Sequence, residues 1–198
     1  RYWRDWSSDV CSSDLQALDG TLILPNTALP GPSGTGGPPT IADFDGDGFA
    51  EFGVAGRGSY SVFDLDCVPG LRGGACASGR TDGILWTREA QDFSSSQTGS
   101  SVFDFEGDGR AEAIYADECF VRVYDGTSGE VIFSQFRSSC TWNENPIVAD
   151  VDGDFNAELV VPSNLNCGVA DLGVVCQNLE AVPLQTLAEL GAHEQELL

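Results

Sequence analysis

An acidic pattern that occurs three times constrains the fold of this chain more than any other feature. Each copy consists of an apolar run, the string D-x-[DE]-G-D-x-x-x-E or a close variant, and a second apolar run. The copies start at Pro39, Ser100 and Asn145. Repeats that recur every 40 to 60 residues or so are typical of propeller blades and longer than helical repeat units.

The segments around the acidic strings are rich in residues that favour strands. YSVFDLD and GILWT follow the first string, and CFVRVYDG and EVIFSQF follow the second. VYDGTSGEVIF has the pattern of a hairpin, with two apolar runs around a Gly/Ser turn. Helical periodicity is weak and confined to LQTLAELGAHEQELL near the C-terminus. The sequence therefore predicts an all-β fold with about four short strands in each unit.

The acidic strings are predicted to be metal-binding loops. Carboxylates at positions 1, 3, 5 and 9 of a tight loop can converge on one point, and glycine at position 4 permits the left-handed backbone that such a turn needs. The carbonyl at position 7 would add a further oxygen. The predicted ligands are Asp43, Asp45, Asp47, Phe49 (carbonyl) and Glu51; Asp104, Glu106, Asp108, Arg110 (carbonyl) and Glu112; and Asp150, Asp152, Asp154, Asn156 (carbonyl) and Glu158.

The ligand types favour Ca²⁺, with about three ions per chain. The loops offer oxygen donors and contain neither His nor Cys, which argues against zinc and copper. An EF-hand would carry Glu at position 12, where this chain has Val54, Tyr115 and Val161. The alternative is an acidic turn without metal, but two carboxylates 4 Å apart repel by about 4 kcal/mol at an effective dielectric constant near 20.

The residue at position 6 predicts the order of calcium affinity among the three loops. It is glycine in the first two copies, Gly48 and Gly109, and Phe155 in the third. If position 6 requires a positive φ, Phe155 is strained by about 1 kcal/mol and the third loop binds several-fold more weakly. If it does not, the second loop is the weakest, because Glu106 is one methylene longer than aspartate.

The three units resemble FG-GAP/VCBS repeats, the blades of integrin α-subunit propellers and of many exported bacterial proteins. Phe52-Gly53-Val54-Ala55-Gly56 is close to the string that names the family, and the resemblance covers about residues 39–165. Copies two and three keep the acidic loop but lose the FG signature. The resemblance implies a β-propeller with Ca²⁺ in a hairpin between the first two strands of each blade. It also implies extracellular adhesion or ligand recognition by loops between blades.

The cysteines indicate an oxidising compartment. Cys11 lies in an N-terminal segment that is expected to be outside the fold. Among the other six cysteines, both Cys67–Cys76 and Cys167–Cys176 have C-x8-C spacing. These two pairs are the expected disulfides, which leaves Cys119–Cys140 as the third. The alternative is a set of buried free thiols in a cytosolic protein.

Composition excludes several classes of partner. The formal net charge is −22 in 198 residues, which disfavours nucleic acid and anionic membrane surfaces. No apolar run approaches the roughly 18 residues of a membrane helix, so this segment is not expected to insert into a membrane. The single His leaves little room for His-dependent catalysis.

The chain divides into four parts. Residues 4–15, RDWSSDVCSSDL, resemble a translated sequencing adapter, so residues 1–15 are expected to lie outside the fold. Residues 16–38 form a partial strand and a Gly/Pro linker, residues 39–176 hold about three blades of a larger propeller, and residues 177–198 are a C-terminal tail without the blade pattern.

The predicted function is a calcium-binding, non-enzymatic module at the cell surface or outside the cell, for adhesion to a protein or glycan ligand. Two alternatives are the propeller part of a secreted polysaccharide-acting enzyme and a structural envelope repeat. For an enzyme, the available extra acids are Asp64, Asp66 and Asp117. Trp86 and Trp142 could stack on sugars, although packing in a β-rich core is the favoured interpretation for both.

Overall fold

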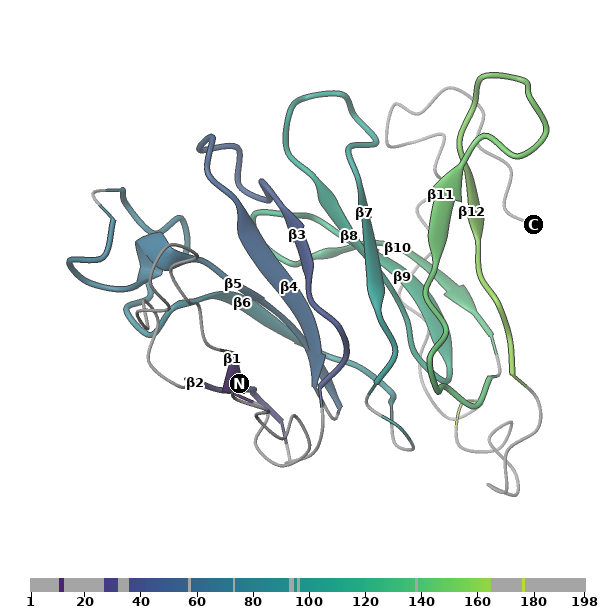
Figure 1. Ribbon diagram of the computed structural model, residues 1–198, viewed down its shortest axis with the longest axis horizontal. Helices are drawn as coiled ribbons and strands as arrows, with labels where there is room; N and C mark the ends of the chain where they lie inside the picture. Colours follow the sequence, from purple (N-terminus) through teal and green to yellow (C-terminus); the bar gives the residue numbers. More distant parts are fainter. Residues whose placement is uncertain are drawn as a thin grey trace, which may run out of the picture.

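The computed structural model describes residues 11–12, 27–31, 36–56, 58–72, 74–92, 95, 97–137, 139–164 and 176. This part of the chain is all-β, as predicted: antiparallel sheets are joined by turns and by a short 3₁₀ helix, η1 (Leu65–Cys67). Three sheets stand side by side along the molecule (Figure 1). Within the described residues, no helix has the length and apolarity needed to cross a membrane.

The first sheet is a four-stranded meander that contains the FGVAG string. It has the order β3 (Thr40–Ala42), β4 (Glu51–Gly56), β5 (Ser59–Phe63), β6 (Ile84–Glu89). β5 is buried along its whole length, as expected for a strand covered on both faces. Gly53 faces the Tyr60 hydroxyl so closely that a Cβ would lie 2.2 Å from it, which explains the glycine of the FG pair.

The second sheet repeats this topology. Its order is β7 (Ser100–Phe103), β8 (Glu112–Ala116), β9 (Phe120–Tyr124), β10 (Val131–Phe136). The predicted hairpin in VYDGTSGEVIF is confirmed, with Tyr124 opposite Val131. Its turn is closed by Asp125, whose carboxylate accepts the Ser128 amide at 2.7 Å, and by Gly129 with φ 71°.

Two further strand pairs complete the described part. β11 (Ile147–Ala149) pairs with β12 (Glu158–Val160), so the third acidic string also lies within a hairpin. β1 (Cys11–Ser12) pairs with β2 (Thr27–Ala28) over two residues. The predicted C-terminal tail, residues 177–198, lies outside the described residues.

The sheets pack through aromatic side chains at their junction. β3 lies beside β7, and β7 beside β11 (Figure 1). Tyr60 and Trp86 of the first sheet stack with Tyr124 of the second, with ring centroids 5.9 and 5.8 Å away. The Trp86 indole donates to the Gly126 carbonyl at 2.6 Å, and Tyr60 donates to the Ser100 hydroxyl at 2.8 Å. Trp86 therefore serves packing, as favoured from the sequence.

The disulfides differ in part from the prediction. Cys67–Cys76 is present as expected, but Cys119 is joined to Cys176, so the predicted Cys119–Cys140 and Cys167–Cys176 pairs are wrong. Cys140 is also disulfide-bonded, to a cysteine whose side chain the structure does not describe. The error arose because matching C-x8-C spacings reflect local sequence, whereas pairing is decided by the packing of Cys119, Phe120 and Cys176 in one buried cluster. Disulfides persist in oxidising compartments, so their presence favours an extracellular location.

Candidate metal centre

The three acidic loops occupy equivalent places. Each connects the first two strands of its sheet: β3 to β4, β7 to β8, and β11 to β12. The loops project from the same edge of the molecule, at the top of Figure 1. The antiparallel pairing brings the residues before and after each loop together, so position 1 comes close to position 9.

The aspartate at position 1 organises each turn through backbone amides. Its two carboxylate oxygens accept the amides of positions 4 and 6, at 2.7 and 2.9 Å in the first loop and with similar distances in the others. The equivalent bonds reach Asp104 and Asp150. To present these amides, the backbone takes a positive φ at both positions: 79° and 88° in the first loop, at Gly46 and Gly48.

Position 6 of the third loop has the same left-handed backbone without a glycine. Phe155 has φ 74°, and its side chain is 96% exposed, so no packing contact offsets the strain. Position 6 therefore has a positive φ in the third loop too, which is the condition on which the predicted order of calcium affinities depends. The third loop is the strained one. The ranking of affinities itself stays a prediction.

The glutamate at position 9 lies beneath each loop and is buried. Glu51, Glu112 and Glu158 are 1%, 4% and 3% exposed. One oxygen of each accepts the amide of position 2, at 2.8 to 2.9 Å. The other oxygen of Glu51, Oε1, is buried without a hydrogen-bond partner.

The carboxylates of positions 1, 3 and 9 converge in all three loops. One oxygen from each lies within 4.8 Å of the other two, and the sets are Asp43, Asp45 and Glu51; Asp104, Glu106 and Glu112; and Asp150, Asp152 and Glu158. Each set could hold a metal ion. The buried, unpartnered oxygen of Glu51 fits this role, because an oxygen withdrawn from water needs a cation or a donor.

Burial and mutual repulsion disfavour the charged forms of several of these carboxylates. Burial raises the pKa of Glu51 to about 8, and nearby Asp45 adds to the rise. Burial likewise raises the pKa of Glu112 to about 8, with a contribution from Glu106. The pKa of Asp45 is raised by burial and by Asp47. A divalent cation at this point would favour the charged forms of all these carboxylates.

The position-5 aspartates lie outside the converging sets, and their neighbours differ between loops. Asp108 forms an ion pair with Arg110, which lowers the pKa of the aspartate. Asp154 accepts the amide and the side-chain Nδ2 of Asn156, at 2.8 and 2.9 Å. Asp47 accepts the Phe49 amide at 2.7 Å, but Phe49 has no side-chain donor to offer it.

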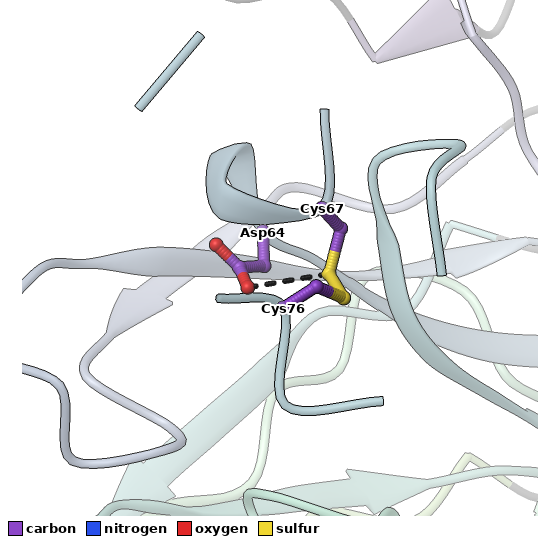
Figure 2. Close-up of side chains that lie close together, drawn as sticks. All are labelled: Asp64, Cys67 and Cys76. Atoms are coloured by element: carbon purple, nitrogen blue, oxygen red, sulfur yellow. Dashed lines mark hydrogen bonds between the residues drawn. A yellow bond between two sulfur atoms is a disulfide. The ribbon is translucent and has the colours of Figure 1, made fainter. Parts of the chain in front are cut away.

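A fourth group of possible metal ligands, Asp64, Cys67 and Cys76, is not a metal site. The two sulfurs form a disulfide, as Figure 2 shows, so they carry no thiolate for a metal. The Asp64 carboxylate approaches the Cys67 sulfur at 3.3 Å, but a disulfide sulfur has no proton to donate. Asp64 instead caps η1, because its Oδ1 accepts the Asp66 amide at 2.7 Å.

Asp117 and Trp142, two further side chains considered from the sequence, lie outside the acidic loops. Asp117 is fully buried and forms an ion pair with Arg122, and it also accepts the Phe120 amide at 2.7 Å. These bonds assign it a structural role. Trp142 is 61% exposed, so the favoured packing interpretation is wrong for this tryptophan.

Comparisons with known proteins give a partial likeness to a solved structure. No protein-family model matches the chain, and no curated protein matches it. A crystal structure of the V. cholerae biofilm matrix protein Bap1 is 30% identical over a match that covers 58% of this chain, with a TM-score of 0.47. The match spans 17% of the Bap1 chain. Because no family model matches, the FG-GAP/VCBS resemblance stays a prediction.

Proposed function

We propose that this chain is a calcium-binding, non-enzymatic module of an extracellular β-propeller, with one Ca²⁺ in each acidic loop. The observation that carries the proposal is the threefold recurrence of one geometry: three carboxylates within 4.8 Å, on a turn held by the position-1 aspartate. A single acidic cluster is common on protein surfaces. Three with the same internal hydrogen bonds, each with a buried glutamate beneath it, favour a common ligand.

Calcium is the cation that best fits these donors. All side-chain donors are carboxylates, and the loops project from the edge of a sheet, where waters can complete six to eight ligands. Mg²⁺ prefers a smaller octahedral shell and keeps most of its waters. Zinc and copper prefer nitrogen and sulfur donors, which the loops lack.

The role proposed for the metal is structural. Without a cation, the carboxylates at positions 1, 3 and 9 repel one another, and burial favours the protonated forms of Glu51 and Glu112. With Ca²⁺ bound, the binding free energy adds to the folding free energy. Sites with a Kd of about 10⁻⁴ to 10⁻³ M are common outside cells. Each site at ten times its Kd then stabilises by about 1.4 kcal/mol.

The propeller and the adhesive role are proposed from the arrangement of the sheets. Two four-stranded antiparallel meanders and a third hairpin stand side by side, each with its acidic loop at the same edge (Figure 1). Propellers close with four to eight such blades, so these three would be part of a larger ring. The proposed ligand is a protein or a glycan, recognised by loops between blades.

Calcium titration calorimetry on the full chain tests the proposal. We expect calcium binding in the wild type and the loss of about one equivalent in each of Asp45→Ala, Glu106→Ala and Asp152→Ala. Asp82→Ala is the matched control, because it removes an exposed carboxylate outside the loops. A chelator should also lower the melting temperature. No calcium binding by the wild type would defeat the proposal.

A further inference from the structure

A backbone hydrogen bond joins the first acidic loop to the second, between their candidate cation sites. The carbonyl of Asp43, position 1 of the first loop, accepts the amide of Ala111 at 2.9 Å. Ala111 directly precedes Glu112, the buried position-9 glutamate of the second loop. A single hydrogen bond therefore connects a member of one converging carboxylate set to the neighbour of a member of the next.

The turn between β9 and β10 packs against both loops beside this hydrogen bond. A Cβ at Gly126 would lie 2.2 Å from the Ala111 carbonyl oxygen and 2.4 Å from the Phe44 carbonyl oxygen. Gly126 is itself held by the first sheet, because its carbonyl accepts the Trp86 indole at 2.6 Å. A shift of either loop backbone at these positions would therefore press on the same turn.

The side chain of Arg110 forms a second connection between the two loops. Its guanidinium pairs with Asp108, position 5 of its own loop, with Nε 2.9 Å from Oδ2. Its aliphatic stem lies against Gly46, position 4 of the first loop, where a Cβ would lie 2.7 Å from Cγ and 3.2 Å from Cδ. The Gly46 amide is bound by the Asp43 carboxylate at 2.7 Å. Arg110 therefore contacts the turn that Asp43 organises.

The second and third loops lack both connections within the described residues. Position 8 of the third loop is Ala157, and no backbone hydrogen bond joins its amide to the Asp104 carbonyl in the described part of the chain. Position 7 is Asn156, whose side chain bonds to Asp154 of its own loop. Nothing lies within 4 Å of a Cβ built at Gly107, position 4 of the second loop. The contacts that join the first two loops are therefore not repeated.

We infer that the first and second cation sites are coupled, so that calcium in one loop raises the affinity of the other, while the third site binds independently. This inference rests on the proposed calcium binding and deepens it. A cation in the first loop fixes Asp43 and the carbonyl that receives the Ala111 amide. The backbone before Glu112 is then already ordered, so the second cation has less of it left to order. Repulsion between the two ions acts in the opposite direction, but salt screens it at exposed loops.

Calcium titration calorimetry of the full chain carrying Asp152→Ala tests the coupling, because only the first two loops then bind. Adding Glu106→Ala isolates the first loop, and adding Asp45→Ala isolates the second. The coupling factor is the product of the two stepwise association constants of the two-loop chain, divided by the product of the two isolated constants. We expect a factor of about five or more, which each loop gains equally by reciprocity. The second and third loops, measured in the same way with Asp45→Ala as the background, should give a factor within about twofold of one.

Ala111→Pro separates the hydrogen bond from other sources of coupling. Proline has no amide hydrogen, so the bond to the Asp43 carbonyl is lost while every proposed ligand side chain stays in the chain. We expect the coupling factor of the first two loops to fall to about one. Ala157→Pro is the matched control at the same position of the third loop, and it should leave that factor unchanged.

Amide hydrogen exchange provides a second measurement, in a chain whose loop backbones are unaltered. When calcium binds only in the first loop, in the chain carrying Glu106→Ala and Asp152→Ala, exchange of the Ala111 amide should slow while that of Ala157 stays the same. A coupling factor of one for the first two loops would overturn the inference while calcium binding by the loops stands. Equal factors for both pairs of loops would also overturn it, because calcium would then act through folding as a whole. Absence of calcium binding in the wild type would remove the proposed function and this inference together.

Discussion

The backbone carbonyl of Asp43 accepts the amide of Ala111 at 2.9 Å, which joins the first acidic loop directly to the second. Asp43 is position 1 of its loop, and Ala111 directly precedes the buried Glu112 of the next. The following residue, Phe44, is fully buried in a cluster with Tyr115 and Tyr124 of the second sheet. The loops are therefore part of the contact between neighbouring sheets as well as candidate metal sites.

Phe44→Ala should destabilise the protein strongly, because it empties the junction between two sheets. Large-to-small changes of a buried phenylalanine cost about 3–5 kcal/mol. Ile41→Ala is the matched control: Ile41 lies in the adjacent strand but is 67% exposed, so the expected change is within about 0.5 kcal/mol. Urea unfolding at saturating calcium measures both. Similar losses in the two variants would show that Phe44 does not anchor the junction.

The repeated string predicted much of the fold because it combines two local signals. Apolar runs on either side of a turn-forming acidic loop specify a hairpin, and the runs that follow supply the outer strands of the two four-stranded sheets. The positive φ at position 6 was predictable for the same reason, since glycine occurs there in two of three copies. These features depend on neighbours in sequence, which the string itself contains.

The features that sequence reasoning missed depend on contacts distant in the chain. Position 2 holds Phe44 and Phe105, both buried, whereas Val151 at the same position is 54% exposed. Aromatic residues inside an otherwise polar loop were a signal for packing between sheets that the sequence reasoning did not use. The pairing of Cys119 with Cys176 had no local signal, because the two cysteines are 57 residues apart in the chain.

The two described disulfides should contribute unequally to stability. Cys119–Cys176 closes a separation of 57 residues and Cys67–Cys76 one of 9. In the chain-entropy model, these loops correspond to about 4 and about 3 kcal/mol. Replacing both members of each pair by serine, followed by urea unfolding, should show the larger loss for Cys119 and Cys176. Peptide mapping without reduction checks the pairing itself, and recovery of a Cys119–Cys140 peptide would contradict it.

The buried ion pair between Asp117 and Arg122 should tolerate little change. Asp117 is fully buried and Arg122 is 8% exposed, so Asp117→Asn leaves a guanidinium without its counter-charge. Loss of one partner of a buried pair costs about 3–5 kcal/mol. The exposed Arg80–Asp82 pair is the control, and Asp82→Asn should cost about 1 kcal/mol or less. If Asp117→Asn unfolds at the same urea concentration as the wild type, Asp117 is not structural and the enzymatic alternative gains support.

Phe155→Gly should strengthen calcium binding in the third loop. Phe155 holds φ 74° and is 96% exposed, so glycine relieves backbone strain and removes almost no packing. The strain for a residue other than glycine is about 1 kcal/mol or more, which corresponds to roughly fivefold in affinity if the free loop escapes that conformation. The reciprocal variant is Gly48→Ala in the first loop, where φ is 88° and no atom lies within 4 Å of an added Cβ, so strain alone should weaken binding by a similar factor. Calcium titration of the two variants measures both changes. Unchanged affinity in both would mean that position 6 keeps its left-handed backbone with or without calcium, and the ranking of the third loop as the weakest would then be wrong.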